Sequence, residues 1–187
     1  MFNIKPIKLD RKEKTRALRK MVVEKVGIVD LDGLYKTMRR WFYDYKYYFE
    51  EPTTRIRPGS AAGVEYEWIW KGWKKPNEYM KQNLDVYFYI WDVKDIEVVK
   101  DGEKVKLTKC RILIEFDGDI ELDYGGFFEK TWWSRILFNL YNSLVLQEEK
   151  QVANWWDELY YHLYKLQTIT KEYLDMEAKG NAYYDVW

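Results

Sequence analysis

The sequence predicts an α+β fold, in which a twisted antiparallel sheet of about five to seven strands carries one N-terminal helix and one or two long C-terminal helices packed on it. Three observations predict this fold. Apolar residues recur at helical spacing after Asp30, apolar and polar residues alternate with a period of two from residue 64 to residue 124, and neither proline nor glycine occurs from residue 127 to residue 179. A chain of 187 residues can bury a substantial core as one domain.

The charge is unevenly distributed, although the total is zero. Residues 1–57 hold 15 Lys and Arg against eight Asp and Glu, whereas the remainder holds 16 against 23. The two parts of the chain either contact each other or the basic part binds a charged partner. We divide the chain into a basic N-terminal arm over 1–19, one α+β domain over 20–180 and an aromatic C-terminal tail over 181–187.

The first strand and the first helix follow one another closely. Residues 20–29 are rich in valine and predict a strand. Asp30 stands where a helix N-cap is expected, and apolar residues then recur at helical spacing from Leu31 to Phe49. The stretch WFYDYKYYF, residues 41–49, also alternates as a strand would. A helix that ends before Pro52 explains more of this segment, so the sequence predicts a helix through Phe49.

The middle of the chain predicts antiparallel strands. Residues 64–71 and 84–91 alternate between apolar and polar side chains, as half-buried strands do. Asp101-Gly102, between two β-prone runs, predicts a hairpin turn. The longest strand signal runs from Cys110 to Tyr124, and Gly118 within it predicts a bulge or a bend.

The last part of the chain predicts helix. One apolar stripe covers residues 133–144 and a second covers residues 152–173, and the register between them is lost over residues 146–151. This pattern indicates either one bent helix or two helices, with a C-terminal stop at Gly180.

Carboxylates line the polar side of the long predicted strand. Glu115, Asp117 and Asp119 are weak metal candidates, because Mg²⁺ and Ca²⁺ prefer oxygen ligands. Neighbours on one face of a strand are ~6.6 Å apart, so an adjacent strand would have to contribute. A solvated face, or one covered by the basic arm, is the preferred interpretation, and we expect no metal site.

The sequence predicts neither a catalytic residue nor a cofactor. It contains no phosphate loop, dinucleotide fingerprint or paired zinc-ligand spacing. His162, the single histidine, lies among aromatic residues and is expected to be structural, and Cys110 is expected to be a buried thiol. An enzyme that uses carboxylates alone would leave no such motif and stays possible.

Two tryptophan pairs, Trp132-Trp133 and Trp155-Trp156, lie in the predicted C-terminal helices. Adjacent helical residues point ~100° apart, so one ring of each pair faces away from the core stripe. That ring either joins a second packed layer or contacts a partner, and Trp is enriched in such contacts.

The predicted first helix carries a basic and aromatic strip opposite its core stripe, formed by Lys36, Arg40, Tyr43 and Tyr47. Other parts of the chain could equally cover it. The candidate partner-binding residues are Lys36, Arg40, Tyr43, Tyr47, Trp132 and Trp155.

VDLDGLYKTMRRWFYDYKYYFEE (29–51), KLTKCRILIEF (106–116) and EKTWWSRILFNLY (129–141) show hydrophobic patterning that resembles a family of small archaeal proteins without assigned activity. The resemblance covers residues 20–178 and consists of patterning without catalytic motifs. It implies a strand and helix followed by an antiparallel sheet and closing helices, an archaeal or archaeal-virus origin, and no functional residues.

The sequence therefore favours a non-catalytic structural or interaction protein, which assembles with itself or binds a protein partner through aromatic helix faces and its termini. One alternative is a carrier of an apolar small molecule between helix and sheet. Another is nucleic-acid binding through the basic N-terminal third. The expected location is the cytoplasm or a particle assembled inside the cell, because the sequence contains no transmembrane segment.

Overall fold

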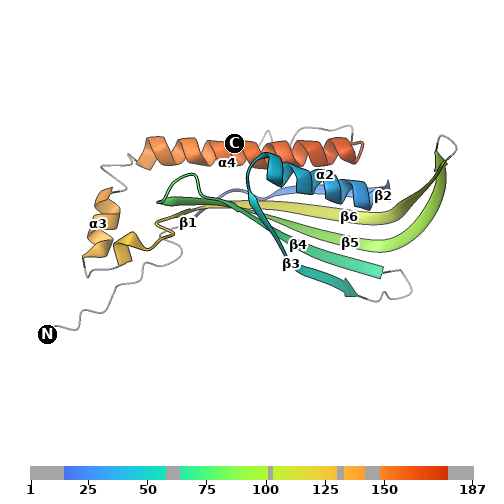
Figure 1. Ribbon diagram of the computed structural model, residues 1–187, viewed down its shortest axis with the longest axis horizontal. Helices are drawn as coiled ribbons and strands as arrows, with labels where there is room; N and C mark the ends of the chain where they lie inside the picture. Colours follow the sequence, from blue (N-terminus) through green and yellow to red (C-terminus); the bar gives the residue numbers. More distant parts are fainter. Residues whose placement is uncertain (1–14, 58–63, 101–102, 130–132, 142–147, 177–187) are drawn as a thin grey trace.

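The computed structural model describes residues 15–57, 64–100, 103–129, 133–141 and 148–176. Residues 1–14 of the predicted arm and the predicted tail 181–187 therefore lie outside the described residues. In Figure 1 two helices lie along one face of a curved antiparallel sheet, and a short helix lies beyond one end of it. The elements in chain order are β1 (Thr15–Ala17), β2 (Met21–Val29), α2 (Leu31–Asp44), β3 (Tyr48–Arg57), β4 (Val64–Lys74), β5 (Met80–Lys100), β6 (Glu103–Leu122), the 3₁₀ turn η1 (Phe127–Glu129), α3 (Ser134–Leu140) and α4 (Glu148–Tyr173).

The sheet has six strands, and the predicted α+β fold is confirmed. Its order is β1-β6-β5-β4-β3, with β2 also paired to β6. β5 and β6 form a long hairpin in which Lys100 pairs with Glu103. The predicted turn therefore has the two-residue length typical of an Asp-Gly hairpin, although residues 101–102 themselves are outside the described part. None of the described helices is long and apolar enough to cross a membrane.

The two faces of the sheet differ in cover. α2 and α4 pack on one of them, which we call the inner face, and alternate residues of β6 point into it. The buried side chains that β6 contributes are Cys110, Ile112, Ile114, Phe116, Ile120 and Leu122. The opposite face, which we call the outer face, carries no helix among the described elements (Figure 1).

The predicted bulge at Gly118 is wrong. The pairing of β5 with β6 runs through Gly118 without a shift. Gly118 instead lies close to α4, where a Cβ would be 2.7 Å from Cδ1 of Leu163. The irregularity lies between Trp91 and Lys94, where the register of β5 against β6 changes. Asp92 at this place has a φ of 57°, in the left-handed region.

The predicted helix end at Phe49 is also wrong, because α2 stops at Asp44. Lys46 adopts a φ of 59°, and the amides of Lys46 and Tyr47 donate to the carbonyls of Tyr43 and Phe42, at 3.0 and 2.8 Å. These two bonds form a Schellman motif, which satisfies the last helical carbonyls and turns the chain into β3. The start of the helix is as predicted: the Asp30 carboxylate accepts a hydrogen bond from the Gly33 amide at 2.9 Å.

The C-terminal region contains separate helices rather than one. α3 and α4 are distinct elements, and residues 142–147 between them are outside the described part. α4 ends at Tyr173, not at the predicted stop Gly180. Asp175 has a φ of 52°, and the Met176 amide donates to the Lys171 carbonyl at 3.0 Å. A second Schellman motif with a non-glycine residue therefore ends α4.

Aromatic rings fill the space between α2 and the sheet. Trp70 is fully buried, and its ring centroid lies 4.9 Å from that of Tyr35, 4.6 Å from that of Phe88 and 5.1 Å from that of Phe49. Such edge-to-face and tilted contacts contribute roughly 0.5–1.5 kcal/mol each beyond the buried area. The helix-covered face of this sheet is thus occupied by side chains of the chain itself.

Candidate functional site

The outer face presents a row of aromatic side chains. Tyr87, Tyr89 and Trp91 are the outward residues of β5, and each is half-buried. The rings of Tyr89 and Trp91 are nearly parallel, with centroids 6.0 Å apart and planes 13° apart. Period two places them on one face of the strand, so together they form a stacking surface of fixed geometry. We call these three residues the aromatic row.

Two cations, one in the link between β1 and β2 and one on β6, already contact this row. The Lys20 ammonium lies 5.4 Å from the Tyr87 ring centroid, and the Arg111 guanidinium carbon lies 5.5 Å from the Trp91 ring centroid. Arg111 also forms an ion pair with Glu24 at 2.7 Å. The outer face therefore binds a guanidinium between a ring and a carboxylate within its own chain.

Apolar side chains of β2 extend the outer face toward the sheet edge. Val22, Val26 and Ile28 point outward and are 44%, 70% and 54% exposed. They neighbour β6 residues of the same face, since Val26 pairs with Arg111 and Val22 pairs with Glu115. Apolar and charged side chains thus alternate across the outer face between the aromatic row and the β2 edge.

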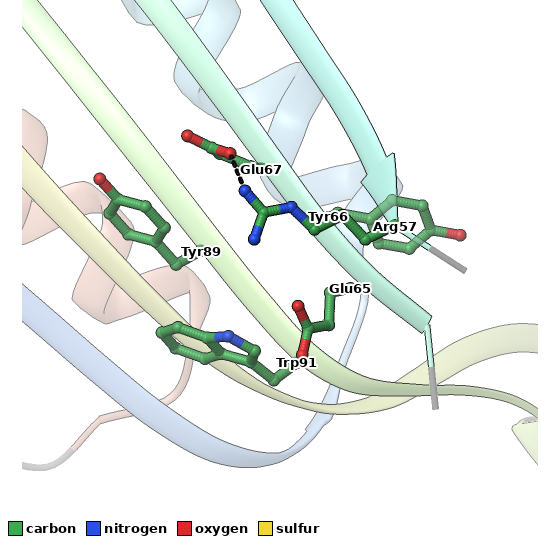
Figure 2. A pocket seen from close by; sticks show the side chains of 6 residues that line it. All are labelled: Arg57, Glu65, Tyr66, Glu67, Tyr89 and Trp91. Atoms are coloured by element: carbon green, nitrogen blue, oxygen red, sulfur yellow. Dashed lines mark ion pairs between the residues drawn. The ribbon is translucent and has the colours of Figure 1, made fainter. Parts of the chain in front are cut away.

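A pocket of about 250 Å³ lies at the other side of the aromatic row (Figure 2). Its lining residues are Arg57, Glu65, Tyr66, Glu67, Tyr89 and Trp91. They come from β3, β4 and β5, which the antiparallel pairs Arg57–Glu65 and Glu67–Tyr89 hold side by side. In Figure 2 the Arg57 guanidinium is directed toward Glu67, and the Glu65 carboxylate lies beside Trp91.

A β-bulge shapes this pocket. Tyr66 pairs with Ile90 but Val64 pairs with Val93, so one residue of β4, Glu65, stands opposite Trp91 and Asp92 of β5. Bulges re-aim side chains and occur often beside functional sites. The left-handed φ of 57° at Asp92 suits an aspartate better than most residues. The bulge therefore fixes how Glu65 and Trp91 face each other.

The two carboxylates of the pocket differ in their partners. Glu67 forms ion pairs with both Arg55 and Arg57, at 3.6 Å each. Glu65 forms no hydrogen bond or ion pair within the described ranges, which end at Arg57 and resume at Val64 around this pocket. The intervening residues 58–63, PGSAAG, contain no basic residue. Within the described residues, the Glu65 carboxylate beside the Trp91 ring thus has no directly paired cation.

The three weak metal candidates, Glu115, Asp117 and Asp119, do not share one set of contacts in the structure. Glu115 and Asp117 lie 3.5 and 3.8 Å from the Lys20 ammonium, whereas Asp119 accepts a hydrogen bond from Asn83 at 2.9 Å. Burial raises the pKa of Asp85, opposed by Lys71 and reinforced by Asp119 and Asp117. Within the described residues, no three His, Cys, Asp or Glu side chains come together in a group that could hold a metal.

The predicted strip on α2 is brought together only in part. Lys36, Arg40 and Tyr43 are exposed on α2, where Lys36 pairs with Asp32 and Arg40 lies 3.7 Å from Asp44. Tyr47 lies beyond the helix end and is only 3% exposed, so it does not share their surface. The cause is the turn at Lys46, which points the next side chain into the core.

The tryptophan candidates are placed unequally. Trp155 is half-buried and packs against the hydrophobic core, while Trp132 lies outside the described residues. Trp133, the neighbour of Trp132, is 43% exposed. The predicted partner-binding role of Trp132 and Trp155 stays a prediction.

His162 belongs to a buried polar network on the inner face. Its Nδ1 lies 2.9 Å from the Tyr47 hydroxyl oxygen, which donates to Gln82 Oε1 at 3.2 Å. Burial raises the pKa of Tyr47. Burial and Lys74 lower the pKa of His162, although Glu158 raises it. A neutral imidazole that donates through Nδ1 to Tyr47 satisfies this chain of bonds, so the network connects the turn after α2 with β5 and α4.

The sequence contains a signal for the aromatic row, although none of its three residues was among the predicted site residues. The outward positions of a half-buried strand are usually polar, yet Tyr87, Tyr89 and Trp91 occupy three in succession. The contributions of Glu65 and Arg57 depend on strand pairing and on the bulge, which no local pattern reveals.

Comparison with known proteins finds neither a family nor a relative for this chain. No protein-family model matches the chain, and a search of curated proteins finds no match. Neither comparison supports the resemblance to archaeal proteins.

Proposed function

We propose that the protein is a non-catalytic interaction domain that binds a protein partner through its outer sheet face. The observation that carries the proposal is the aromatic row of Tyr87, Tyr89 and Trp91 on a face that none of the described helices covers. Tyr, Trp and Arg are the residues most enriched at the centres of protein interfaces. The outer face combines all three types with the exposed valines of β2.

The two alternatives receive less support from the geometry. A carrier of an apolar molecule needs space between helix and sheet, where the fully buried Trp70 packs against the buried rings of Phe42 and Phe88. Nucleic-acid binding needs free cations to contact phosphates. Several basic residues of the N-terminal third are paired with acidic residues of the same chain: Lys20, Lys36, Arg40, Arg55 and Arg57.

A photo-crosslinking amino acid at Tyr87 tests the proposal in cells that make the protein. We expect a discrete cross-linked protein from this position, and a lower yield when Trp91→Ser is added. The matched control is the same substitution at Tyr161, which is 55% exposed on α4. Cross-linking from Tyr161 alone would contradict the proposal.

A third position separates the helix hypothesis from the sheet hypothesis. Tyr43 is 59% exposed beside Lys36 and Arg40 on α2. Capture from Tyr43 but not from Tyr87 would favour the basic helix strip as the binding surface. A product of twice the chain's mass from Tyr87 would identify a second copy as the partner.

A further inference from the structure

We propose that the pocket beside Trp91 binds a guanidinium group, supplied by an arginine side chain of the protein partner. The inference rests on the proposed function for the source of the arginine, since the partner is the protein that covers the outer face. The pocket itself is defined by its six lining residues from β3, β4 and β5, independently of that partner.

The size of the pocket fits one side chain. Pockets for drug-sized ligands usually enclose ~300–1,000 Å³. This one encloses about 250 Å³ and opens onto a face that a protein would cover. A single long side chain that enters from an opposing surface matches this volume better than a free metabolite does.

Glu65 is the carboxylate of the pocket that could pair with a bound cation. Arg55 and Arg57 both pair with Glu67, so this carboxylate is already compensated. Glu65 has no such partner in the described part of the chain. A guanidinium placed between Glu65 and the ring of Trp91 would form a charge-assisted hydrogen bond and a cation–π contact together.

The same face already contains the proposed arrangement. Arg111 lies over the Trp91 ring with its guanidinium carbon 5.5 Å from the centroid, and it pairs with Glu24 at 2.7 Å. Glu65 lies on the β4 side of Trp91, whereas Arg111 and Glu24 lie on the β6 and β2 side. A ligand guanidinium would repeat on one side of Trp91 what Arg111 does on the other.

Arginine is a better fit than lysine because of its shape. The nearly parallel rings of Tyr89 and Trp91, 13° apart, offer flat surfaces on which a planar guanidinium can stack. A lysine ammonium is a hydrated point charge and cannot stack.

An NMR titration of the full-length protein tests the inference with N-acetyl-arginine N-methylamide as the probe. The chain has ten tryptophans, and the Trp91→Phe variant identifies the indole N–H signal of Trp91. We expect this signal to shift saturably with the arginine probe, and not with N-acetyl-citrulline N-methylamide, which has nearly the same shape but no charge. Equal shifts with both probes, or none with arginine, would overturn the inference. Equal affinity for the lysine analogue would overturn the assignment of a guanidinium.

The Glu65→Gln variant removes the charge and keeps the shape of the side chain. We expect it to weaken the probe roughly fivefold or more, as the loss of a charge-assisted contact should. Glu78→Gln, at the opposite end of β4 on an exposed turn, makes the same charge change away from the pocket and should bind as the wild type does. Tyr89→Leu keeps an apolar side chain but removes a ring, and it should weaken the probe without loss of fold. Unchanged affinity in Glu65→Gln would contradict the proposed site.

The outcomes distinguish this inference from the proposed function. If the Trp91 signal responds to arginine but Tyr87 captures no protein, the pocket binds guanidinium and the proposed function fails. The opposite outcome is an equal cross-linking yield from position 87 in the wild type and in Glu65→Gln, together with a Trp91 indole signal that does not shift with the probe. The proposed function then stands and this inference fails.

Discussion

Single residues in unusual backbone conformations occur where the fold differs from what the apolar pattern of the sequence predicts. Lys46, Asp92 and Asp175 all have positive φ, and each ends a helix or forms a bulge. Glycine is the residue expected at such points, since other L-residues pay about 1–2 kcal/mol for the left-handed conformation. These positions are therefore hard to predict from the sequence when lysine or aspartate occupies them. The Asp30 cap, in contrast, follows a strong residue preference and was predictable.

Gly72 is the residue at which we expect the sharpest packing effect. A Cβ at Gly72 would lie 2.8 Å from Phe42 Cδ1 and 3.2 Å from the Leu84 carbonyl oxygen. Neither a buried ring nor a strand backbone can move freely, so Gly72→Ala should lower the free energy of unfolding by about 1–3 kcal/mol. Urea denaturation measures this loss.

Gly118→Ala provides the matched control for Gly72→Ala. Its Cβ would meet the terminal methyl of Leu163 at 2.7 Å, and the end of a leucine side chain can rotate away. We expect a clearly smaller loss of stability than at Gly72. A loss at Gly118 as large as that at Gly72 would show that α4 cannot shift and that the ring of Phe42 is not the deciding obstacle.

Secondary-structure elements were predictable where one pattern dominates. The alternation in β4, β5 and β6 reflects a sheet with one covered face, so the buried members could be read from period two. The end of α2 could not, because Tyr45 and Phe49 continue the helical spacing beyond Asp44. The Schellman motif at Lys46 ends the helix there, and Tyr47 packs on Phe42 with ring centroids 6.2 Å apart. That contact between the residue after the turn and the last turn is typical of the motif.

A glycine in place of Lys46, after the end of α2, should therefore stabilise the protein. Lys46→Gly removes the steric cost of the left-handed conformation, and we expect the free energy of unfolding to rise by about 0.5–1 kcal/mol. Lys46→Ala is the control, since it removes the same side chain but keeps a Cβ. Chemical denaturation of both variants decides the matter: equal stabilities would mean that the loss of the lysine side chain, not the backbone, causes any change.

At the scale of the whole molecule, the order of the sheet joins distant parts of the chain. β1 and β2, near the start, pair with β6, the last strand, rather than with their neighbours in sequence. This pairing extends the outer face to β2, whereas the pairing of β3, β4 and β5 and the bulge at Trp91 create the pocket. Patterning predicts the strands and their buried sides, but it contains no information on which strand lies beside which, so the pocket could not be predicted.

The buried network around His162 predicts how the stability of the whole fold depends on pH. Burial and Lys74 lower the pKa of His162 below its ordinary value of 6.5, so the unfolded chain takes up a proton at a higher pH than the folded chain does. The contribution of His162 to the free energy of unfolding is therefore fully present above about pH 6.5. It declines as the pH falls from there toward the pKa of His162 in the folded protein, because the unfolded state binds more protons in that range.

The urea midpoint should accordingly decrease between pH 7.5 and pH 5, and His162→Gln should lessen this decrease. Glutamine can still bond the Tyr47 hydroxyl but does not titrate, so the difference between the two pH curves isolates the imidazole. Asp85 acts in the opposite sense at lower pH, because burial raises its pKa from 3.8 and its protonation stabilises the folded state. It contributes equally to both proteins. Parallel curves for wild type and His162→Gln would show that His162 accepts a proton in the folded protein as readily as in the unfolded chain, and the network would then have to open at its contact with Tyr47.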